Sequence, residues 1–388
     1  MLASSVRHSL VRFGGLTLSV IGLGAGIVAS APKPEPPTYV GFVAPMIRRH
    51  CAPCHRAGGV GPFTFDTYED VKRQIELLRV QILSGQMPPN ADKSDFGHFP
   101  VATSISAEDV VAFQEWIVAK MPRGEGEPPP PTAAPEFGYP GAKVVSVPSV
   151  LPIPAEGVQQ WRTFEIPGSY SGQTIRAFDI EPDAPKVMRN AVLRIGHVNG
   201  TVAGVWAPGY RRWQAPNGKG MAVPEGAKLY VRALYQPSGK PESSGFKIAL
   251  DSGSARPLRQ KHLIHDDFTI KAEASRTLTL IHRIEADTEL VSFLPVARFY
   301  CGRVKIVLRL PNDEEKLIFE TLRWNPYWVG NYQFAEPTKI PAGSQITASF
   351  EYNNDENCPM NDGKRPVDVN SGPRLEDEAC ELFLTFTE

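Results

Sequence analysis

The order of apolar and polar residues divides the chain into two parts. Over residues 38–121, apolar residues recur at helical spacing, as in YEDVKRQIELLRVQILSG, where Asp66 or Thr67 can cap the helix. The segment SAEDVVAFQEWIVAKM opens with Ser106 and has Asp109 three residues later, which is typical of a helix start. We therefore predict an α-helical domain over residues 38–121.

From about residue 143 the pattern changes to short strand-like runs separated by Gly, Pro and Asn turns. These runs are VVSVPSVL, KLYVRALY, FKIAL, TLTLIH, VKIVLRL and QITASFEY. There is no alternation of strands and helices, so the pattern predicts antiparallel β-sandwiches. The segment SGSARPLRQ is a candidate joint, which gives one β domain over residues 143–255 and a second over residues 256–388. The Pro-rich segment of residues 122–142 is expected to be an extended linker.

The first 37 residues predict export. Arg7 and Arg12 precede the uncharged stretch FGGLTLSVIGLGAGIVASA, which is about long enough to span a bilayer. The residues ASA resemble a cleavage site, but Pro32 would follow the cut directly. Residues 1–37 are therefore expected to be a signal peptide or an N-terminal membrane anchor plus spacer. Either alternative places the remainder of the chain on the periplasmic side of the membrane.

Composition narrows the class of protein further. The chain has 388 residues with 42% apolar content, enough for two or three domains with cores of their own. Its formal net charge of -1 gives no field that would attract nucleic acid, so no nucleic-acid partner is expected. Five cysteines are too few for a disulfide-dense scaffold.

The pentapeptide CAPCH carries the chemistry of the helical part. Such a motif can hold a metal, form a redox disulfide or carry a covalent haem. A thioredoxin-like site would follow a strand in a βαβ unit, and a zinc site would need a second ligand pair at finger spacing. Haem attachment fits best, with Cys51 and Cys54 bonded to one haem c and His55 as the proximal iron ligand. A carbonyl at Gly61 or Pro62 is expected to accept the ring N–H of His55.

The sixth iron ligand is expected downstream, in SGQMPPN. Met87 is the first candidate, because the prolines after it stiffen the loop and a thioether favours Fe(II). His98 is the next candidate, followed by Met46. The alternative for Met87 is an ordinary residue packed in a surface loop.

The segments CAPCHRAGGVGPFTFDTY, VQILSGQMPPN and EDVVAFQEWI together resemble bacterial c-type cytochrome domains. The resemblance covers about residues 38–121 and implies one haem c and single-electron transfer to a redox protein or membrane complex. Asn90 stands where relatives often carry tryptophan.

The β region contains, in this order, the segments PDAPKVMRNAVLRI, GVWAPGY, KLYVRALYQPSGK, FLPVARFYCGRVKIVLRLPN, EYNNDEN and LEDEACELFL. These segments carry a resemblance to a second family, the copper type II, ascorbate-dependent monooxygenases that hydroxylate peptidylglycine and dopamine. The resemblance covers about residues 143–388 and implies two jelly-roll domains. Bacterial relatives often carry a cytochrome c domain in front.

The copper ligands of that family are replaced here. The family binds copper through histidines and one methionine. The corresponding places hold Arg189, Asn190, Leu234, Val296, Arg298 and Ala379. Four histidines remain in the region, which we interpret as structural rather than as a relocated copper site: His197, His262, His265 and His282. Copper is therefore not expected.

Cys380 lies in a motif that is disulfide-bonded in the family. The resemblance implies Cys358 as its partner, and an exported protein permits the bond. Cys301 would then be a free buried thiol, although pairings that involve Cys301 stay open.

Three functions are compatible with these motifs. The favoured one is a membrane-tethered c-type cytochrome whose copper-free β module serves for docking, so that the chain is an electron carrier and not an enzyme. The second is a structural or electron-transfer subunit of a membrane respiratory or photosynthetic complex. The third is a monooxygenase that receives electrons from the haem, which would need copper ligands that the sequence lacks.

Overall fold

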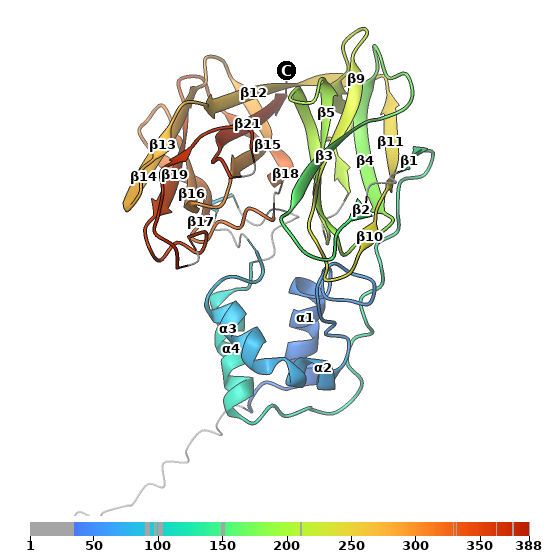
Figure 1. Cartoon of the computed structure of the whole chain (residues 1–388), viewed down its shortest axis with the longest axis vertical. Coiled ribbons are helices and arrows are strands. Elements are labelled where there is room, and N and C mark those ends of the chain that lie inside the picture. Colours follow the sequence, from blue (N-terminus) through green and yellow to red (C-terminus); the bar gives the residue numbers. More distant parts are fainter. Residues whose placement is uncertain are drawn as a thin grey trace, which may run out of the picture. The chain divides into compact units, whose positions relative to one another are not determined.

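The structure is a computed structural model that describes residues 35–89, 94–96, 99, 104–148, 152–209, 212–328, 330, 332–361, 363–374 and 376–387. The predicted signal or anchor segment, apart from its last residues, Asn90 and His98 lie outside these residues. Within the described ranges, no helix is long and apolar enough to cross a bilayer. Residues Pro36–Glu388 form one compact unit, which contains every helix and strand named below (Figure 1).

The helical part has the helices that the spacing predicts. They are a π-helical turn Tyr39–Val43, α1 Ala44–His50, α2 Tyr68–Arg73, α3 Ile75–Leu83 and α4 Ala107–Val118. Thr67 caps α2, since its hydroxyl accepts the Asp70 N–H at 3.1 Å and the Asp70 carboxylate accepts the Thr67 N–H. Ser106 caps α4 by accepting the Asp109 N–H at 3.0 Å. Both predicted helix starts are confirmed, and both follow from a side-chain oxygen that satisfies a backbone donor.

A small aromatic core holds the helices together. Phe113 and Trp116 of α4 are fully buried with Tyr39 and Ile47. The Trp116 indole N–H donates to the Pro122 carbonyl at 3.0 Å, so the end of the helical part is attached to its own core. This core supports the back of α1, whose C-terminal end carries the first cysteine of the CAPCH motif.

The first β-sandwich packs two sheets over residues 143–253. One sheet has the order β1 Lys143–Val147, β11 Phe246–Gly253, β4 Thr174–Pro182 and β8 Lys219–Ala222, with β7 Trp213–Gln214 beside β4. The other has the order β3 Gln160–Glu165, β9 Lys228–Tyr235, β5 Met188–Gly196 and β6 Thr201–Trp206. The short strands β2 Pro152–Ile153 and β10 Glu242–Ser243 pair with each other. Residues from both sheets fill the core between them, with Phe178, Leu193, Val231 and Ile248 among the most buried.

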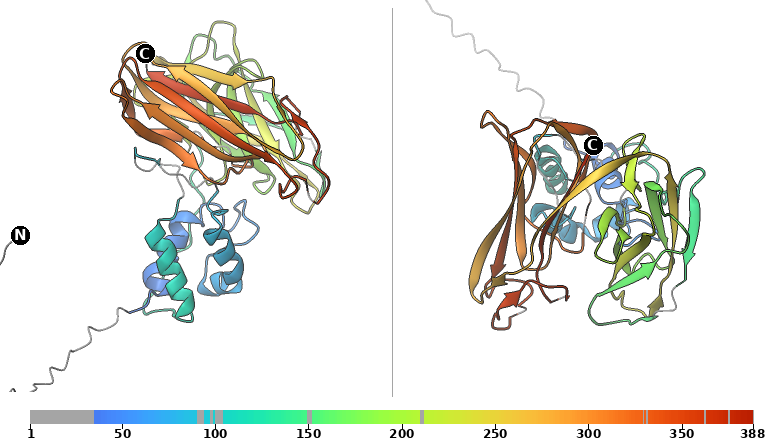
Figure 2. Two further views of the ribbon diagram at one scale, coloured as in Figure 1. Left: turned by 90° about the vertical axis from the view of Figure 1, so that its left-hand side faces the viewer. Right: turned by 90° about the horizontal axis from the view of Figure 1, so that it is seen from above.

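The second β-sandwich is built in the same way, and Figure 2 shows its orange and red strands as stacked layers. One sheet has the order β12 Arg256–His265, β21 Cys380–Thr387, β15 Thr288–Ala297 and β18 Tyr332–Ile340. The other has the order β14 Ala274–Arg283, β19 Gln345–Asn354, β16 Cys301–Arg309 and β17 Glu315–Thr321. The strands β13 Thr269–Ile270 and β20 Val369–Asn370 form a further pair. In β19 the burial alternates strictly along the strand, which is the period of a sheet with one buried face.

The two sandwiches are joined through one sheet and one interface. Strand β12 pairs with β21 and, in parallel, with β8 of the first sandwich, so a single sheet runs through both. The parallel pair differs from the purely antiparallel arrangement that the turns predict. Val192 and Val205 of the first sandwich pack against Leu294 and Phe383 of the second. The β-sandwich class is thus confirmed, and the sandwiches meet through the outer faces of β5 and β6 on one side and of β15 and β21 on the other.

Candidate functional site

The CAPCH motif forms one tight turn at the end of α1. Cys51 follows the helix directly, and its backbone N–H donates to the Ile47 carbonyl at 2.9 Å. The Cys51 carbonyl accepts the N–H groups of Cys54, at 3.2 Å, and of His55, at 2.9 Å. This turn places both thiols and the imidazole on the wall of one cavity.

The orientation of the His55 ring is set from two sides. Its Nδ1 lies 3.2 Å from the Phe63 carbonyl oxygen, and its face stacks on Phe65 at a centroid distance of 4.9 Å. Because a carbonyl can only accept, Nδ1 carries the proton and Nε2 is left as the nitrogen with a lone pair. Burial lowers the pKa of His55, which keeps the ring neutral at pH 7. The acceptor is Phe63 and not Pro62, so that prediction was off by one residue.

Gly61 is required by its approach to this ring. A Cβ at position 61 would lie 2.6 Å from Nδ1 and 2.8 Å from Cγ of His55. The chain returns along the imidazole here, since the Gly61 N–H donates to the Cys54 carbonyl at 3.0 Å. Only a residue without a side chain fits between this backbone and the ring.

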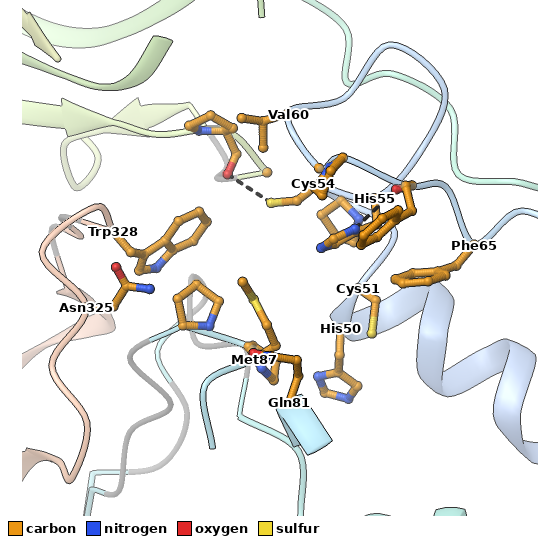
Figure 3. Close-up of a pocket in the computed structure, with 18 of the residues that line it drawn as sticks. His50, Cys51, Cys54, His55, Val60, Phe65, Gln81, Met87, Asn325 and Trp328 are labelled. Carbon is orange, nitrogen blue, oxygen red and sulfur yellow. Dashed lines mark hydrogen bonds between the residues drawn. The ribbon is translucent and has the colours of Figure 1, made fainter. Parts of the chain in front are cut away.

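The cavity beside these groups has a volume of about 370 Å³ (Figure 3). Its wall is mostly apolar in the helical part, with Val60, Phe63, Phe65, Leu77, Leu78 and Ile82. Met87 follows the end of α3, and Figure 3 shows its thioether projecting into the same space as Cys54 and His55. The structure therefore places the four residues of the predicted haem site at one cavity.

One other predicted candidate for the iron ligand lies away from the cavity, and one histidine that lines the cavity was not predicted. Met46 is 3% exposed and belongs to the helical core, so it is not at the cavity. His50, which precedes the motif, does line the cavity, although the sequence analysis did not single it out. Its position next to Cys51 at a helix end was the available signal.

The two thiols are poor thiolates in this setting. Burial raises the pKa of Cys51 to about 12 and that of Cys54 to about 11, so both are protonated at neutral pH. A redox-active thiolate needs a lowered pKa, so this environment gives no support to the redox alternative for the motif.

The β region completes the cavity, which the sequence did not reveal. Pro208, Gly209, Asn325, Tyr327 and Trp328 line it together with Arg189 of β5. The carbonyl oxygen of Pro208 lies 3.4 Å from the Sγ of Cys54. A Cβ at Gly209 would lie 2.6 Å from the same sulfur, so glycine is needed for the close approach.

Arg189 adds a charge to this wall. Burial lowers its pKa, while Tyr327 and Cys54 act in the opposite direction. Its Nε is buried and has no hydrogen-bond partner among the described residues. A guanidinium group thus lies near the Cys54 side of the cavity, and none of the described carboxylates forms an ion pair with it.

The places of the family's copper ligands do not converge here. Arg189 lines the cavity of Cys54, whereas Leu234, Val296 and Arg298 line a smaller cavity between the sandwiches. Asn190 is fully buried, and Ala379 is 6% exposed. No group of three His, Cys, Asp or Glu side chains in the described part of the chain is arranged to hold a metal ion. The copper-free interpretation stays a prediction.

The histidines of the β region have structural partners. His262 Nε2 lies 2.8 Å from a Glu381 oxygen, and its ring stacks on Phe383 at 4.0 Å. His265 Nε2 lies 3.0 Å from the Thr279 carbonyl oxygen.

The cysteines of the second sandwich are all free thiols in the structure. Cys358, Cys380 and Cys301 are 7%, 0% and 4% exposed. The Cys358–Cys380 disulfide is therefore not formed here and stays a prediction. Cys301 and Cys380 belong to the same core cluster, so Cys301 is a second candidate partner for Cys380.

Comparisons with known proteins do not assign this site. Neither a protein-family model nor a curated protein matches the chain. Among solved structures, the chain is similar to the major capsid protein P2 of bacteriophage PM2, with 8% identity and a TM-score of 0.26 over 63% of this chain and 96% of that one. So slight a likeness identifies neither fold nor function, and the two family resemblances stay predictions.

Proposed function

We propose that the chain is an exported, membrane-tethered c-type cytochrome that carries single electrons. In this proposal Cys51 and Cys54 hold one haem c covalently, His55 is the proximal ligand and Met87 the sixth ligand. The β module binds no copper and serves to dock the protein on a redox protein or membrane complex.

One observation carries the proposal: the two thiols, the imidazole and the thioether meet at one apolar cavity. The residues present fit a haem. His55 presents Nε2 as its one nitrogen with a lone pair, because the Phe63 carbonyl holds the Nδ1 proton. The apolar wall excludes water, which favours the less charged, reduced state of an iron centre. A haem bound here supplies reversible one-electron exchange.

The role of the β module is supported by where its residues lie. Residues around Pro208 and Trp328 form part of the wall next to Cys54, so a partner that docks on the β module comes close to the cavity. In this proposal the surface and loops of the β body form the docking interface. Docking through this body brings the partner into electron-transfer distance.

The test is the attachment of haem in the full-length protein made in a host that matures c-type cytochromes. We expect colour to stay with the protein after acid–organic extraction and a pyridine haemochrome spectrum of c type. The double variant Cys51→Ser/Cys54→Ser should lose covalent haem, whereas the control Cys301→Ser should keep it. Absence of haem, or haem that is fully extracted from the wild-type protein, refutes the proposal.

Metal analysis separates the electron carrier from a monooxygenase. After loading with copper and dialysis, we expect iron in the protein without stoichiometric copper. We also expect no ascorbate-driven hydroxylation. Two tightly bound coppers per chain would contradict the copper-free assignment.

A further inference from the structure

A second, smaller cavity of about 80 Å³ lies where the outer faces of the two sandwiches meet. Strands β3, β5 and β9 contribute one wall, and β15 and β21 contribute the other. Three arginine side chains line it together: Arg194, Arg232 and Arg298. They are accompanied by Gln159, Trp161 and Glu381.

The strand register explains why two of these arginines share a face. Arg232 of β9 lies opposite Val192 of β5, and Arg194 follows Val192 by two residues. Residues two apart on a strand point to the same face, so Arg194 and Arg232 are diagonal neighbours. Two guanidinium groups on adjacent strands therefore face the same small space.

The three guanidinium groups differ in how many of their hydrogen-bond donors have partners. Arg298 donates to the carbonyl oxygens of Gly372, at 3.0 Å, and of Asp377, at 2.9 Å, and also contacts that of Arg374. Its guanidinium is thus held by the protein itself.

Arg194 and Arg232 are left with donors to spare. Arg194 donates from Nη1 to the Gly200 carbonyl at 3.0 Å, but its buried Nε has no hydrogen-bond partner in the part of the chain that the structure describes. Arg232 stacks on Trp161 at 4.7 Å and has no hydrogen bond or ion pair to any described residue. The Oε1 of Gln159 is also buried without a partner. Among the described residues, one unpartnered guanidinium Nε and one unpartnered amide oxygen thus line the same small cavity as Arg232, and a flip of the amide would present its NH₂ group instead.

The charges around the cavity do not balance. Burial lowers the pKa of all three arginines, and Arg194 and Arg298 lower that of Arg232 further, while nearby carboxylates, chiefly Glu378 and Asp377, act in the opposite direction on Arg298. Against these three guanidinium groups, the opposite wall provides the carboxylate of Glu381, which attracts all three and also lies 2.8 Å from His262 Nε2. Glu378 lies beyond Arg298, where its carboxylate accepts backbone N–H groups, including that of Tyr300 at 2.8 Å. Partly buried cations repel one another unless an anion lies between them and offsets their charge.

We propose that this cavity binds one small oxyanion, held chiefly by Arg232 and Arg194 with the amide of Gln159. The planar guanidinium group suits the paired oxygens of a carboxylate, phosphate or sulfate. A volume of about 80 Å³ admits only a small anion or a single terminal group. No described residue lines both this cavity and the cavity of Cys54, although Pro326 lies between two residues of the latter, Asn325 and Tyr327.

Isothermal titration of the full-length protein tests the site. The protein is dialysed into a chloride buffer and titrated at constant ionic strength with phosphate, sulfate, acetate and formate in separate experiments. We expect one anion per chain and a matching rise in melting temperature. Binding of phosphate and sulfate without the carboxylates identifies a tetrahedral ligand, and the reverse identifies a carboxylate.

Variants locate the binding. Arg232→Gln should weaken the anion that binds best by about tenfold or more, since it removes a charge-assisted pair of hydrogen bonds. The control Arg309→Gln, at an exposed arginine of β16 that pairs with Asp313, should bind like wild type. If Arg232→Gln does not fold, Arg194→Gln takes its place. Absence of binding by the folded wild-type protein, or equal binding by the variant, overturns the proposal.

Discussion

Replacing Gly61 by alanine tests whether the His55 ring is held as the structure shows. A Cβ at position 61 would lie 2.6 Å from Nδ1, 2.8 Å from Cγ and 3.0 Å from Cε1 of the ring. The closest of these contacts is about 0.8 Å shorter than ordinary van der Waals contact. The ring cannot retreat freely, because its face stacks on Phe65 and its Nδ1 is 3.2 Å from the Phe63 oxygen.

The magnitude follows from these contacts. Overpacking by one methyl group in a well-packed site costs about 1–3 kcal/mol. The Nδ1 hydrogen bond is already long, so a displaced ring loses it, at a cost of about 0.5–1.5 kcal/mol. We therefore expect Gly61→Ala to lower the free energy of unfolding of the helical part by about 1.5–4.5 kcal/mol.

The assay is guanidinium denaturation followed by helix ellipticity. The matched control is Gly302→Ala, where the added Cβ would meet no atom nearer than Glu351 O at 3.8 Å. In the haem-loaded protein, a displaced His55 should also weaken the low-spin spectrum and let the ferrous form bind carbon monoxide. If Gly61→Ala is as stable as Gly302→Ala and has an unchanged spectrum, the described position of the ring is wrong.

Three further changes have defined outcomes. Met87→Ala should open the sixth iron position and make the ferrous protein bind carbon monoxide readily; an unchanged visible spectrum would mean that another residue is the ligand. Trp116→Ala should destabilise the helical part by about 3–5 kcal/mol in the same denaturation assay, because it empties a fully buried site and removes one of the two hydrogen bonds that the Pro122 carbonyl accepts. Arg189→Gln should lower the haem midpoint potential by roughly tens of millivolts, since a nearby cation favours the reduced iron, whereas Arg309→Gln should not. Redox titration at two ionic strengths checks this result, and equal potentials would show that Arg189 does not act on the iron.

Local features were predictable because they depend on neighbours in the chain. The caps at Thr67 and Ser106 follow from a hydroxyl placed three residues before the donor that it satisfies. The strand-like runs, including KLYVRALY and QITASFEY, are strands β9 and β19. The closeness of Cys51, Cys54 and His55 also follows from their spacing, since one turn joins them.

Contacts between segments that are far apart in the chain were not predictable from local patterns. Sequence reasoning placed the acceptor for His55 at Gly61 or Pro62, but the carbonyl that reaches Nδ1 is that of Phe63. A shift of one residue changes the direction of a carbonyl, and no local pattern sets it. The parallel pairing of β8 with β12 has the same origin, because it joins residues far apart in the chain.

Spacing and periodicity thus sufficed for the helices, for several of the strands and for the turn of the CAPCH motif, because hydrogen bonds within a turn and the alternation of a strand are local. Tertiary packing alone brought Arg189 and Pro208 of the β region to the Cys54 cavity, and Arg194 and Arg232 to a second cavity against Glu381. A cavity wall depends on which faces of separate sheets are buried against each other. That choice is made by the summed burial of many apolar side chains, and it leaves no mark at the positions of the polar residues that it brings together.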